Sequence, residues 1–233
     1  MRSPRSAARP LYSLYCLLVF TALGLVTLGV NLFLPSLRRR RLVAGACSRV
    51  FLRLAGIPFS VQGLNMLPRV PCVVVANHAS YIDGLVAAAA LPPDFAFVIK
   101  KEMVRVPLAS LLLRRLGSQF VERFDRHKGG VDARRVLKLA ATGQSLVFFP
   151  EGTFDDTPRI GKFLGGAFAT AARSEMPVVA VAIHGTRAVL PCGGMSIHRL
   201  PIRVEILEVM TASDARQRSR ELIARAVGEP LTP

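Results

Sequence analysis

An uncharged apolar run near the start of the chain constrains its fold more than any other feature. Residues 11–34 (LYSLYCLLVFTALGLVTLGVNLFL) carry no charged side chain. As a helix this run is about 36 Å long, at about 1.5 Å per residue, which is enough to cross a bilayer. A cleaved signal peptide would have an apolar stretch of only about 7–15 residues and a small-residue cleavage site. This chain has Arg38–Arg41 there, so we expect a retained membrane anchor.

The charge of the chain is strongly positive and unevenly distributed. The 233 residues carry a net charge of +16, and the first acidic residue is Asp83. Such a field attracts either nucleic acid or anionic lipid headgroups. The basic residues adjoin the apolar run, the sequence has no Trp, and no nucleic-acid-binding motif is recognisable. We therefore expect membrane lipids, and no nucleic acid, as partners.

A basic amphipathic segment follows the apolar run. Over residues 36–56, apolar side chains recur at helical spacing, and the other face carries Arg38, Arg41, Arg49 and Arg53. The pattern predicts a helix in the headgroup region with its arginines on lipid phosphates. The alternative is a helix docked on the catalytic core with solvated arginines. We assign residues 1–56 to a membrane anchor and residues 57–233 to a catalytic domain.

The orientation of the anchor is less constrained. Arginines flank both ends of the apolar run, and the stronger cluster, Arg38–Arg41, lies behind it. The positive-inside rule then favours a membrane protein whose catalytic domain faces the cytoplasm. The arginines at both ends of the apolar run also permit a helical hairpin in one leaflet, so spanning and monotopic anchors both stay open.

The chain has four scattered cysteines: Cys16, Cys47, Cys72 and Cys192. They lack metal-ligand spacing, so they fit a reducing compartment and predict no metal site.

From residue 57 the sequence changes to short β-branched runs that alternate with amphipathic stretches. This rhythm is typical of an α/β domain. We expect a mixed, largely parallel sheet flanked by helices, preceded by an N-terminal membrane-associated helical segment. The expected strands are 59–62, 72–76, 95–99, 119–122, 146–149, 178–183 and 202–209. The expected helices of the domain are 104–116, 131–142, 163–174 and 213–227.

A histidine and an aspartate follow the strand expected at 72–76. His78 stands at the end of this strand and Asp83 lies five residues further on, and α/β folds hold their sites at strand ends. If a turn or helix begins near Ser80, Asp83 reaches one imidazole nitrogen and the other nitrogen faces the cleft as a base. The alternative is a capping box formed by Ser80 and Asp83, with His78 merely buried nearby.

A neutral histidine oriented by a carboxylate suits acyl transfer to an alcohol. The hydroxyl must lose its proton as it attacks a thioester carbonyl, and such a histidine accepts that proton well. No serine or cysteine lies in a G-x-S-x-G turn. Direct attack without an acyl-enzyme is therefore the simpler interpretation, and we expect no cofactor beyond the acyl donor.

Further polar clusters stand at other expected element ends. Arg123 follows the strand expected at 119–122, where its guanidinium could clamp a phosphate, although a surface pair with Glu122 or Asp125 explains it equally well. The sequence Glu151-Gly152-Thr153 forms a turn in which glycine allows close backbone approach and threonine can donate to a phosphate. An ordinary strand-to-loop turn is the alternative there. Lys162 precedes a glycine-rich helix entry, a kind of site that binds anions.

Taken together and in this order, these clusters resemble the 1-acylglycerol-3-phosphate acyltransferase family over residues 73–190. The segment from His78 to Asp83 is similar to the family's H-x-x-x-x-D block, which implies His78 as general base and Asp83 as the residue that orients it. Residues 117–123 resemble the second block, which implies that Arg123 contacts the acceptor's phosphate. The F-P-E-G-T sequence at 149–153 resembles the third block and implies acceptor binding by Glu151, Gly152 and Thr153.

The resemblance also covers two lysines, and besides the residue before Lys162 it has two departures: Phe154, and Ala180 in place of the second proline of the usual strand motif. Lys101 lies in a segment similar to the one ahead of the second block, and Lys162 lies in a stretch similar to F-K-x-G-A-F; both are implied as substrate-binding residues. Before Lys162 this chain has Gly161 where the family has Phe. After Thr153 it has Phe154, followed by two aspartates, where an arginine or another polar residue is usual.

The resemblance implies a membrane enzyme of phospholipid biosynthesis. It would transfer a fatty acyl group from acyl-CoA or acyl-carrier protein to a lysophospholipid, with 1-acyl-sn-glycerol-3-phosphate as the expected acceptor and phosphatidate as product. Cationic Lys101, Arg123 and Lys162 favour this phosphomonoester. Asp155 and Asp156 favour an acceptor with a cationic amine, such as a lyso-aminolipid. A non-catalytic lipid-binding or nucleic-acid-binding membrane protein is the alternative of a different class.

Overall fold

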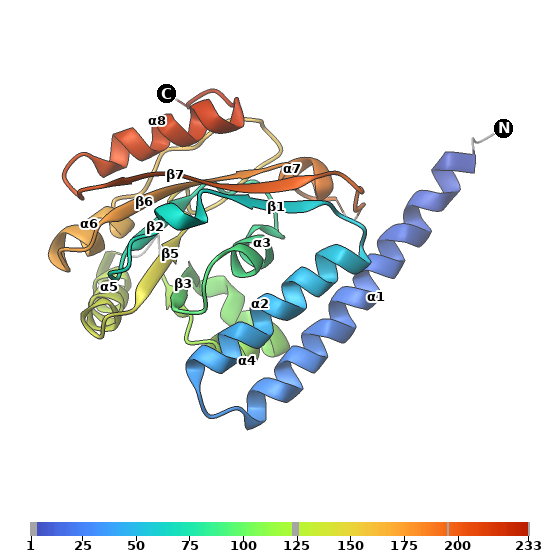
Figure 1. The fold of residues 1–233 in the computed structure, drawn as a ribbon, viewed down its shortest axis with the longest axis horizontal. Coiled ribbons are helices and arrows are strands. Elements are labelled where there is room, and N and C mark those ends of the chain that lie inside the picture. The colour runs from blue at the N-terminus through green and yellow to red at the C-terminus, as the bar shows by residue number, and fades with distance from the viewer. Residues whose placement is uncertain (1–3, 123–125, 195, 233) are drawn as a thin grey trace.

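Two long helices precede the sheet in the computed structural model, which describes residues 4–122, 126–194 and 196–232. Helix α1 spans Pro4–Phe33, and helix α2 (Leu37–Leu54) runs back along it (Figure 1). The stretch Pro10–Phe33 of α1 is long and apolar enough to cross a membrane and is mostly unburied. Both helices expected from the sequence are present.

Within the described residues, seven strands form one sheet in the order β1-β7-β6-β2-β5-β3-β4. The strands that run parallel to one another are β2 (Val73–Ala76), β3 (Phe95–Lys100), β4 (Gln119–Val121), β5 (Ser145–Phe148) and β6 (Val178–His184). Strand β7 (Ile202–Met210) is antiparallel to β6 and parallel to the edge strand β1 (Phe59–Gln62). The expected mixed, largely parallel sheet is confirmed.

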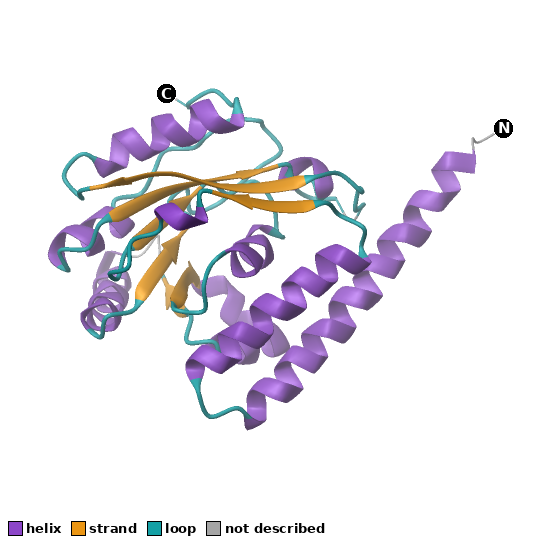
Figure 2. Cartoon of the chain, in the orientation of Figure 1, coloured by secondary structure: helices purple, strands orange, loops and turns teal. Residues whose placement is uncertain are grey.

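The central strands are covered by helices on both faces, which explains their unbroken apolar sequences. Val74 of β2 belongs to a core that includes Phe51 of α2 and Val86 of α3 (Asp83–Ala90). Its neighbour Val73 belongs to the core on the other face of the sheet, which contains residues of α5, α6 and α8. These helices span Arg126–Ala141, Gly166–Arg173 and Ala215–Val227. Figure 2 shows the helical layers on the two faces.

Several short elements complete the chain. The expected helix at 104–116 is divided into a 3-10 helix, η2 (Lys101–Arg105), and helix α4 (Pro107–Arg115), because Pro107 can begin a helix but not continue one. Helix α3, the 3-10 helix η1 (Leu64–Met66) and helix α7 (Thr186–Val189) were not among the expected elements. Most of α3 is buried, so its sequence shows no amphipathic period.

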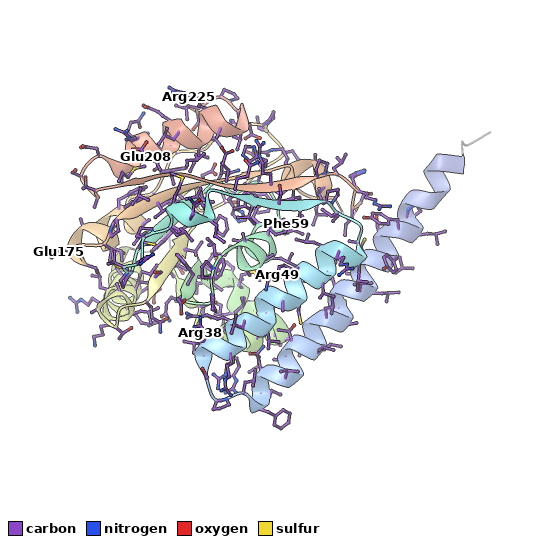
Figure 3. The ribbon with its side chains drawn as sticks, viewed as in Figure 1. Arg38, Arg49, Phe59, Glu175, Glu208 and Arg225 are labelled. Carbon is purple, nitrogen blue, oxygen red and sulfur yellow. The ribbon has the colours of Figure 1, made fainter. Side chains whose placement is uncertain are left out.

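Two arginines of α2 contact the catalytic core, which corrects an expectation from the sequence. Arg41 donates to the carbonyl oxygen of Leu116, just after α4, at 2.9 Å, and Arg49 donates to that of Ala89, near the end of α3, at 2.8 Å. Carbonyl groups at helix C-termini have no partner within their own helix, so a guanidinium satisfies them. The prediction that these two arginines rest on lipid phosphates is therefore wrong. Arg38 does remain exposed (Figure 3).

Two points of α1, one in its N-terminal half and one near its C-terminal end, are bonded to the rest of the chain, while its N-terminal end projects beyond the domain (Figure 1) and its outer face is bare. The Tyr12 hydroxyl donates to the carbonyl oxygen of Ala55 at 2.6 Å, and Arg115 donates to that of Asn31 at 2.7 Å. Figure 3 shows mostly carbon side chains projecting from α1. Exposed leucines on this helix include Leu14 at 52%, Leu18 at 61% and Leu25 at 52%. The helix therefore lies along the domain and presents an apolar surface.

Candidate active site

One edge of the sheet gathers the residues singled out from the sequence. The carboxyl ends of β2, β5, β3 and β4 lie side by side there, because these strands are parallel neighbours. His78 follows β2, Glu151 follows β5 and Lys101 follows β3. Arg123, which follows β4 in sequence, lies outside the described residues. Ligand sites of α/β folds commonly occupy such an edge.

His78 and Asp83 form a hydrogen-bonded pair at this edge. The imidazole Nδ1 lies 2.8 Å from Oδ2 of Asp83, which is fully buried at the first position of α3. A carboxylate only accepts hydrogen bonds, so Nδ1 carries the proton and a neutral imidazole keeps its lone pair on Nε2. The geometry therefore leaves Nε2 as the basic nitrogen.

The Asp83 carboxylate also closes the turn that carries His78. Its Oδ2 accepts the backbone N–H groups of Ala79 and Ser80, each at 2.7 Å. The Ser80 hydroxyl instead donates to the carbonyl oxygen of Leu190 at 2.7 Å. One half of the capping box considered from the sequence is thus present together with the His78 pair, and the two interpretations do not exclude each other. Three donors on one oxygen hold Asp83 in place.

Asn77 locks the segment before His78 to the neighbouring strand. Its side-chain amide donates to the carbonyl oxygen of Ile183 on β6 at 2.9 Å and accepts that residue's N–H at 2.8 Å. The buried amide thereby continues the pairing of β2 with β6 by one side chain. Nothing in the sequence pattern pointed to this role, because the partner lies 106 residues away.

Glu151 connects two loops around the site. Its Oε1 accepts the backbone N–H of His78 at 2.8 Å, and its Oε2 accepts that of Gly161 at 2.6 Å. Burial raises the pKa of the Glu151 carboxyl, and the two N–H groups oppose that rise. The side chain thus positions the histidine's backbone. Its predicted contact with the acceptor stays a prediction.

Aromatic rings surround the imidazole, a feature that the sequence analysis missed. The ring of Phe149 stacks on His78 with centroids 4.7 Å apart. The ring of Phe154, one of the two departures from the family pattern, meets His78 edge-on at 4.4 Å. The only signal in the sequence was the presence of two phenylalanines around the Glu151 turn.

The other predicted substrate-binding residues lie at the surface of the same region. Lys101 is the first residue of η2, Lys162 follows Gly161, and both are exposed, as is Thr153. Gly152 has a φ of 81°, in the left-handed region that favours glycine. In the described part of the chain, no group of His, Cys, Asp and Glu side chains is arranged to hold a metal ion. The substrate contacts of these residues stay predictions.

The charge of Asp155 is compensated locally. Its carboxylate accepts the N–H of Thr157 at 2.9 Å and pairs with Arg159 at 2.7 Å. The Thr157 N–H first, and Arg159 second, lower the pKa of this carboxyl. Arg159 therefore offsets part of the negative charge of Asp155, although the pair is solvent-exposed and weak.

Comparison with known proteins decides the family. A family model described as Acyltransferase matches residues 58–184, which is more than half of the chain. The chain belongs to this family. The match runs from β1 to the end of β6 and includes the His78–Asp83 pair, Lys101, the Glu151 turn and Lys162 of the acyltransferase domain.

Individual relatives agree with this family. A chloroplastic 1-acyl-sn-glycerol-3-phosphate acyltransferase of Brassica napus is 31% identical over 165 residues, which cover 69% of this chain and 48% of the plant protein. A lyso-ornithine lipid O-acyltransferase of Pseudomonas aeruginosa is 32% identical over 182 residues, covering 72% of this chain and 68% of that protein. The chain spans less than half the length of the plant relatives from Brassica napus and Arabidopsis thaliana.

A solved structure shares the fold of the acyltransferase chain. The crystal structure of the 1-acyl-sn-glycerophosphate acyltransferase from Thermotoga maritima matches with a TM-score of 0.79 at 22% sequence identity. The superposition covers 96% of each chain, so it includes the two N-terminal helices as well as the sheet.

Proposed function

We propose that this chain is an O-acyltransferase of the 1-acylglycerol-3-phosphate type. It transfers a fatty acyl group from a thioester donor, acyl-CoA or acyl-carrier protein, to the free hydroxyl of a lysophospholipid. The observation that carries this proposal is the pair formed by His78 and Asp83, which leaves Nε2 as the basic nitrogen at a strand end. The family of the chain supports the reaction type.

The geometry supports direct attack by the acceptor. The Nε2 lone pair of His78 takes the hydroxyl proton as the hydroxyl oxygen bonds to the thioester carbonyl carbon. The carbon–sulfur bond then breaks, and the proton passes from Nε2 to the departing sulfur. Asp83 holds the imidazole in the required tautomer and stabilises the imidazolium that forms between these steps.

The preferred acceptor in this proposal is 1-acyl-sn-glycerol-3-phosphate, which gives phosphatidate. Exposed Lys101 and Lys162, with Arg123, supply the cations that a phosphomonoester requires. The Asp155 carboxylate would repel an acceptor phosphate, and its pairing with Arg159 weakens this repulsion. Relatives named for this acceptor occur in plants and bacteria.

A lyso-ornithine lipid is the second candidate acceptor. Two relatives carry this name, from Pseudomonas aeruginosa and Rhizobium meliloti, each 32% identical to this chain. The lipid bears an amine, and exposed Asp156 lies just past the Glu151 turn. An amine-bearing acceptor would be attracted to this carboxylate.

We also propose that the chain works at the inner membrane with its catalytic domain on the cytoplasmic side, and that α1 lies in one leaflet. The hydrogen bonds made by Tyr12 and Asn31 hold the stretch of α1 between them against one domain. If this stretch crossed the hydrocarbon core, which is about 30 Å thick, it would carry one of the two contacts to the far side of the bilayer, away from a domain that stays on one side. The bare apolar face of α1 supports burial among acyl chains.

The test uses the purified full chain in lipid vesicles. Acyl-CoA or acyl-carrier protein is supplied with lysophosphatidate, lysophosphatidylethanolamine or lyso-ornithine lipid, and both free thiol and acylated lipid are measured. Wild-type protein is expected to prefer lysophosphatidate, and His78→Ala to lower kcat by about two to four orders of magnitude. His198→Ala serves as the matched control. A folded, membrane-bound His78→Ala protein with wild-type turnover would exclude the proposed mechanism, and preference for an amine-bearing lipid would favour the second acceptor.

A further inference from the structure

Three aromatic side chains surround His78 in layers. Phe149, which stacks on the imidazole, is buried and forms the floor. Phe154 is half-buried and meets the imidazole edge-on, and Tyr81, 64% exposed, packs edge-on against Phe154 with centroids 4.9 Å apart. Only 21% of the His78 side chain is accessible to solvent. Tyr81 and Phe154 thus form an outer aromatic rim beside the base.

The backbone that carries Phe154 is held by contacts of two consecutive carbonyl groups with the body of the domain. The Phe154 carbonyl oxygen lies 4.0 Å from the Cys192 thiol, and the Asp155 carbonyl oxygen accepts a hydrogen bond from Arg187. Arg187 is itself fixed by the Glu229 carboxylate at 3.2 and 3.3 Å. These bonds connect an otherwise exposed loop to the body of the domain. The position of the Phe154 ring is therefore built into the fold.

A base that activates a lipid hydroxyl also activates water, since both present the same O–H group. Attack by water on the thioester carbonyl carbon forms a carbon–oxygen bond and breaks the carbon–sulfur bond. The products are a free fatty acid and a free thiol, with the water proton passing through His78 to the sulfur. An acyltransferase at a membrane surface must therefore limit the access of water to its base.

We propose that Phe154, together with Tyr81, is a specificity-determining residue that keeps bulk water from His78, so that the acyl group passes to a lipid hydroxyl. The inference rests on the acyl transfer proposed above. Apolar rings cannot hydrogen-bond an ordered water beside the imidazole, and they offer the alkyl chain of a lipid a favourable surface.

The experiment measures two products of one reaction. The purified full chain in vesicles is given acyl-CoA and a limiting amount of the acceptor that wild-type protein uses, and free fatty acid and acylated lipid are quantified together. Phe154→Ser removes the ring, whereas Phe154→Leu keeps an apolar side chain at the same place. Tyr81→Ser opens the aromatic rim from its exposed side. Leu164→Ser, which removes an exposed apolar side chain from a residue outside the aromatic rim, is the matched control.

The expected result is a change in partitioning. Phe154→Ser should raise the ratio of free fatty acid to acylated lipid by about tenfold, and Tyr81→Ser should raise it in the same direction. Phe154→Leu and Leu164→Ser should leave the ratio within about twofold of wild type. An unchanged ratio in Phe154→Ser, an equal loss of both products, or an equal rise in Phe154→Leu would overturn the inference. Wild-type protein that forms no acylated lipid at all would instead contradict the proposed function.

Discussion

The carboxylate of Glu151 accepts the backbone N–H of His78 at 2.8 Å, although the two residues are 73 positions apart in the sequence. The same side chain accepts the N–H of Gly161 at 2.6 Å. A Cβ atom at position 161 would lie 2.9 Å from Glu151 Oε2, closer than side chains normally approach. The glycine that replaces the family's Phe thus leaves room for the residue that positions the histidine.

We expect Gly161→Ala to lower kcat by about ten- to a hundredfold, because the added methyl group displaces the Glu151 carboxylate and shifts the His78 backbone. Glu151→Gln should act in the same direction. Each oxygen of the Glu151 carboxylate accepts one N–H group, and the NH2 group that replaces one oxygen in glutamine cannot accept a hydrogen bond. Gly166→Ala is the matched control, because a Cβ there meets open space. Steady-state kinetics of folded variants check this prediction. Equal activity of Gly161→Ala and Gly166→Ala would show that the close approach has no catalytic consequence.

The Asp83 carboxylate should be indispensable for turnover. Asp83→Asn removes the charge that stabilises the imidazolium and places a donor where buried Oδ1 has no hydrogen-bond partner among the described residues. We expect kcat to fall by about two to four orders of magnitude. The buried unsatisfied donor should lower the free energy of unfolding by about 1–3 kcal/mol. Kinetics and urea unfolding measure the two effects, with exposed Asp94→Asn as control; retention of more than half of the wild-type kcat would contradict the assigned role.

Membrane binding should depend on the apolar face of α1. Replacing Leu14, Leu18 and Leu25 by Ser removes three exposed side chains, each of which contributes about 1.5–3 kcal/mol when fully buried in an apolar phase. We expect the variant to leave vesicles in a flotation assay while wild-type protein stays bound after a high-salt wash. Leu64, Val209 and Leu231, exposed on other elements, provide the control set. Undiminished binding of the α1 variant would place the anchor elsewhere.

Deleting residues 1–56 tests the anchor less cleanly. Phe51 and Leu52 of α2 are buried in the core that also contains Val74 of β2. Their loss would expose apolar surface of the catalytic domain and destabilise it. The boundary between anchor and catalytic domain at residue 56 stays a prediction. Substitutions of exposed α1 side chains test membrane binding without disturbing that core.

The unfolding free energy should fall on mild acidification through His184. This side chain lies at the end of β6, with Nε2 3.1 Å from Glu205 and Nδ1 3.4 Å from Arg203. Burial first, and the Arg203 charge second, lower its pKa below the ordinary value of about 6.5. Its contribution to stability is therefore present above about pH 6.5 and is lost as pH falls through the lowered pKa. Urea unfolding between about pH 5 and 8 should show a smaller decrease for His184→Gln than for wild type; identical pH profiles would contradict this assignment.

Local patterns in the sequence were sufficient for the strands and for the central pair, though not for the short helices α3 and α7. Each expected strand lies within one residue of its observed bounds, because β-branched runs and flanking turn residues act over a few positions. His78 and Asp83 are separated by one turn of chain, so their spacing alone brought them into reach. The family resemblance agrees with the Acyltransferase model that matches residues 58–184, since its motifs are short segments with fixed spacing.

Only the tertiary structure decided what surrounds that pair. The order of the strands, the docking of α2 on α3 and that of α1 on α4 are set by packing among distant segments, which no local period encodes. For this reason Arg41 and Arg49 proved to satisfy helix C-termini and not lipid phosphates. For the same reason Asn77, Glu151 and Phe154 acquired their roles, since each acts on a residue brought close by the sheet or by a loop and not by its neighbours in sequence. The sequence by itself determined the His78–Asp83 pair, and the folded chain determined the hydrogen bonds and aromatic rings around it.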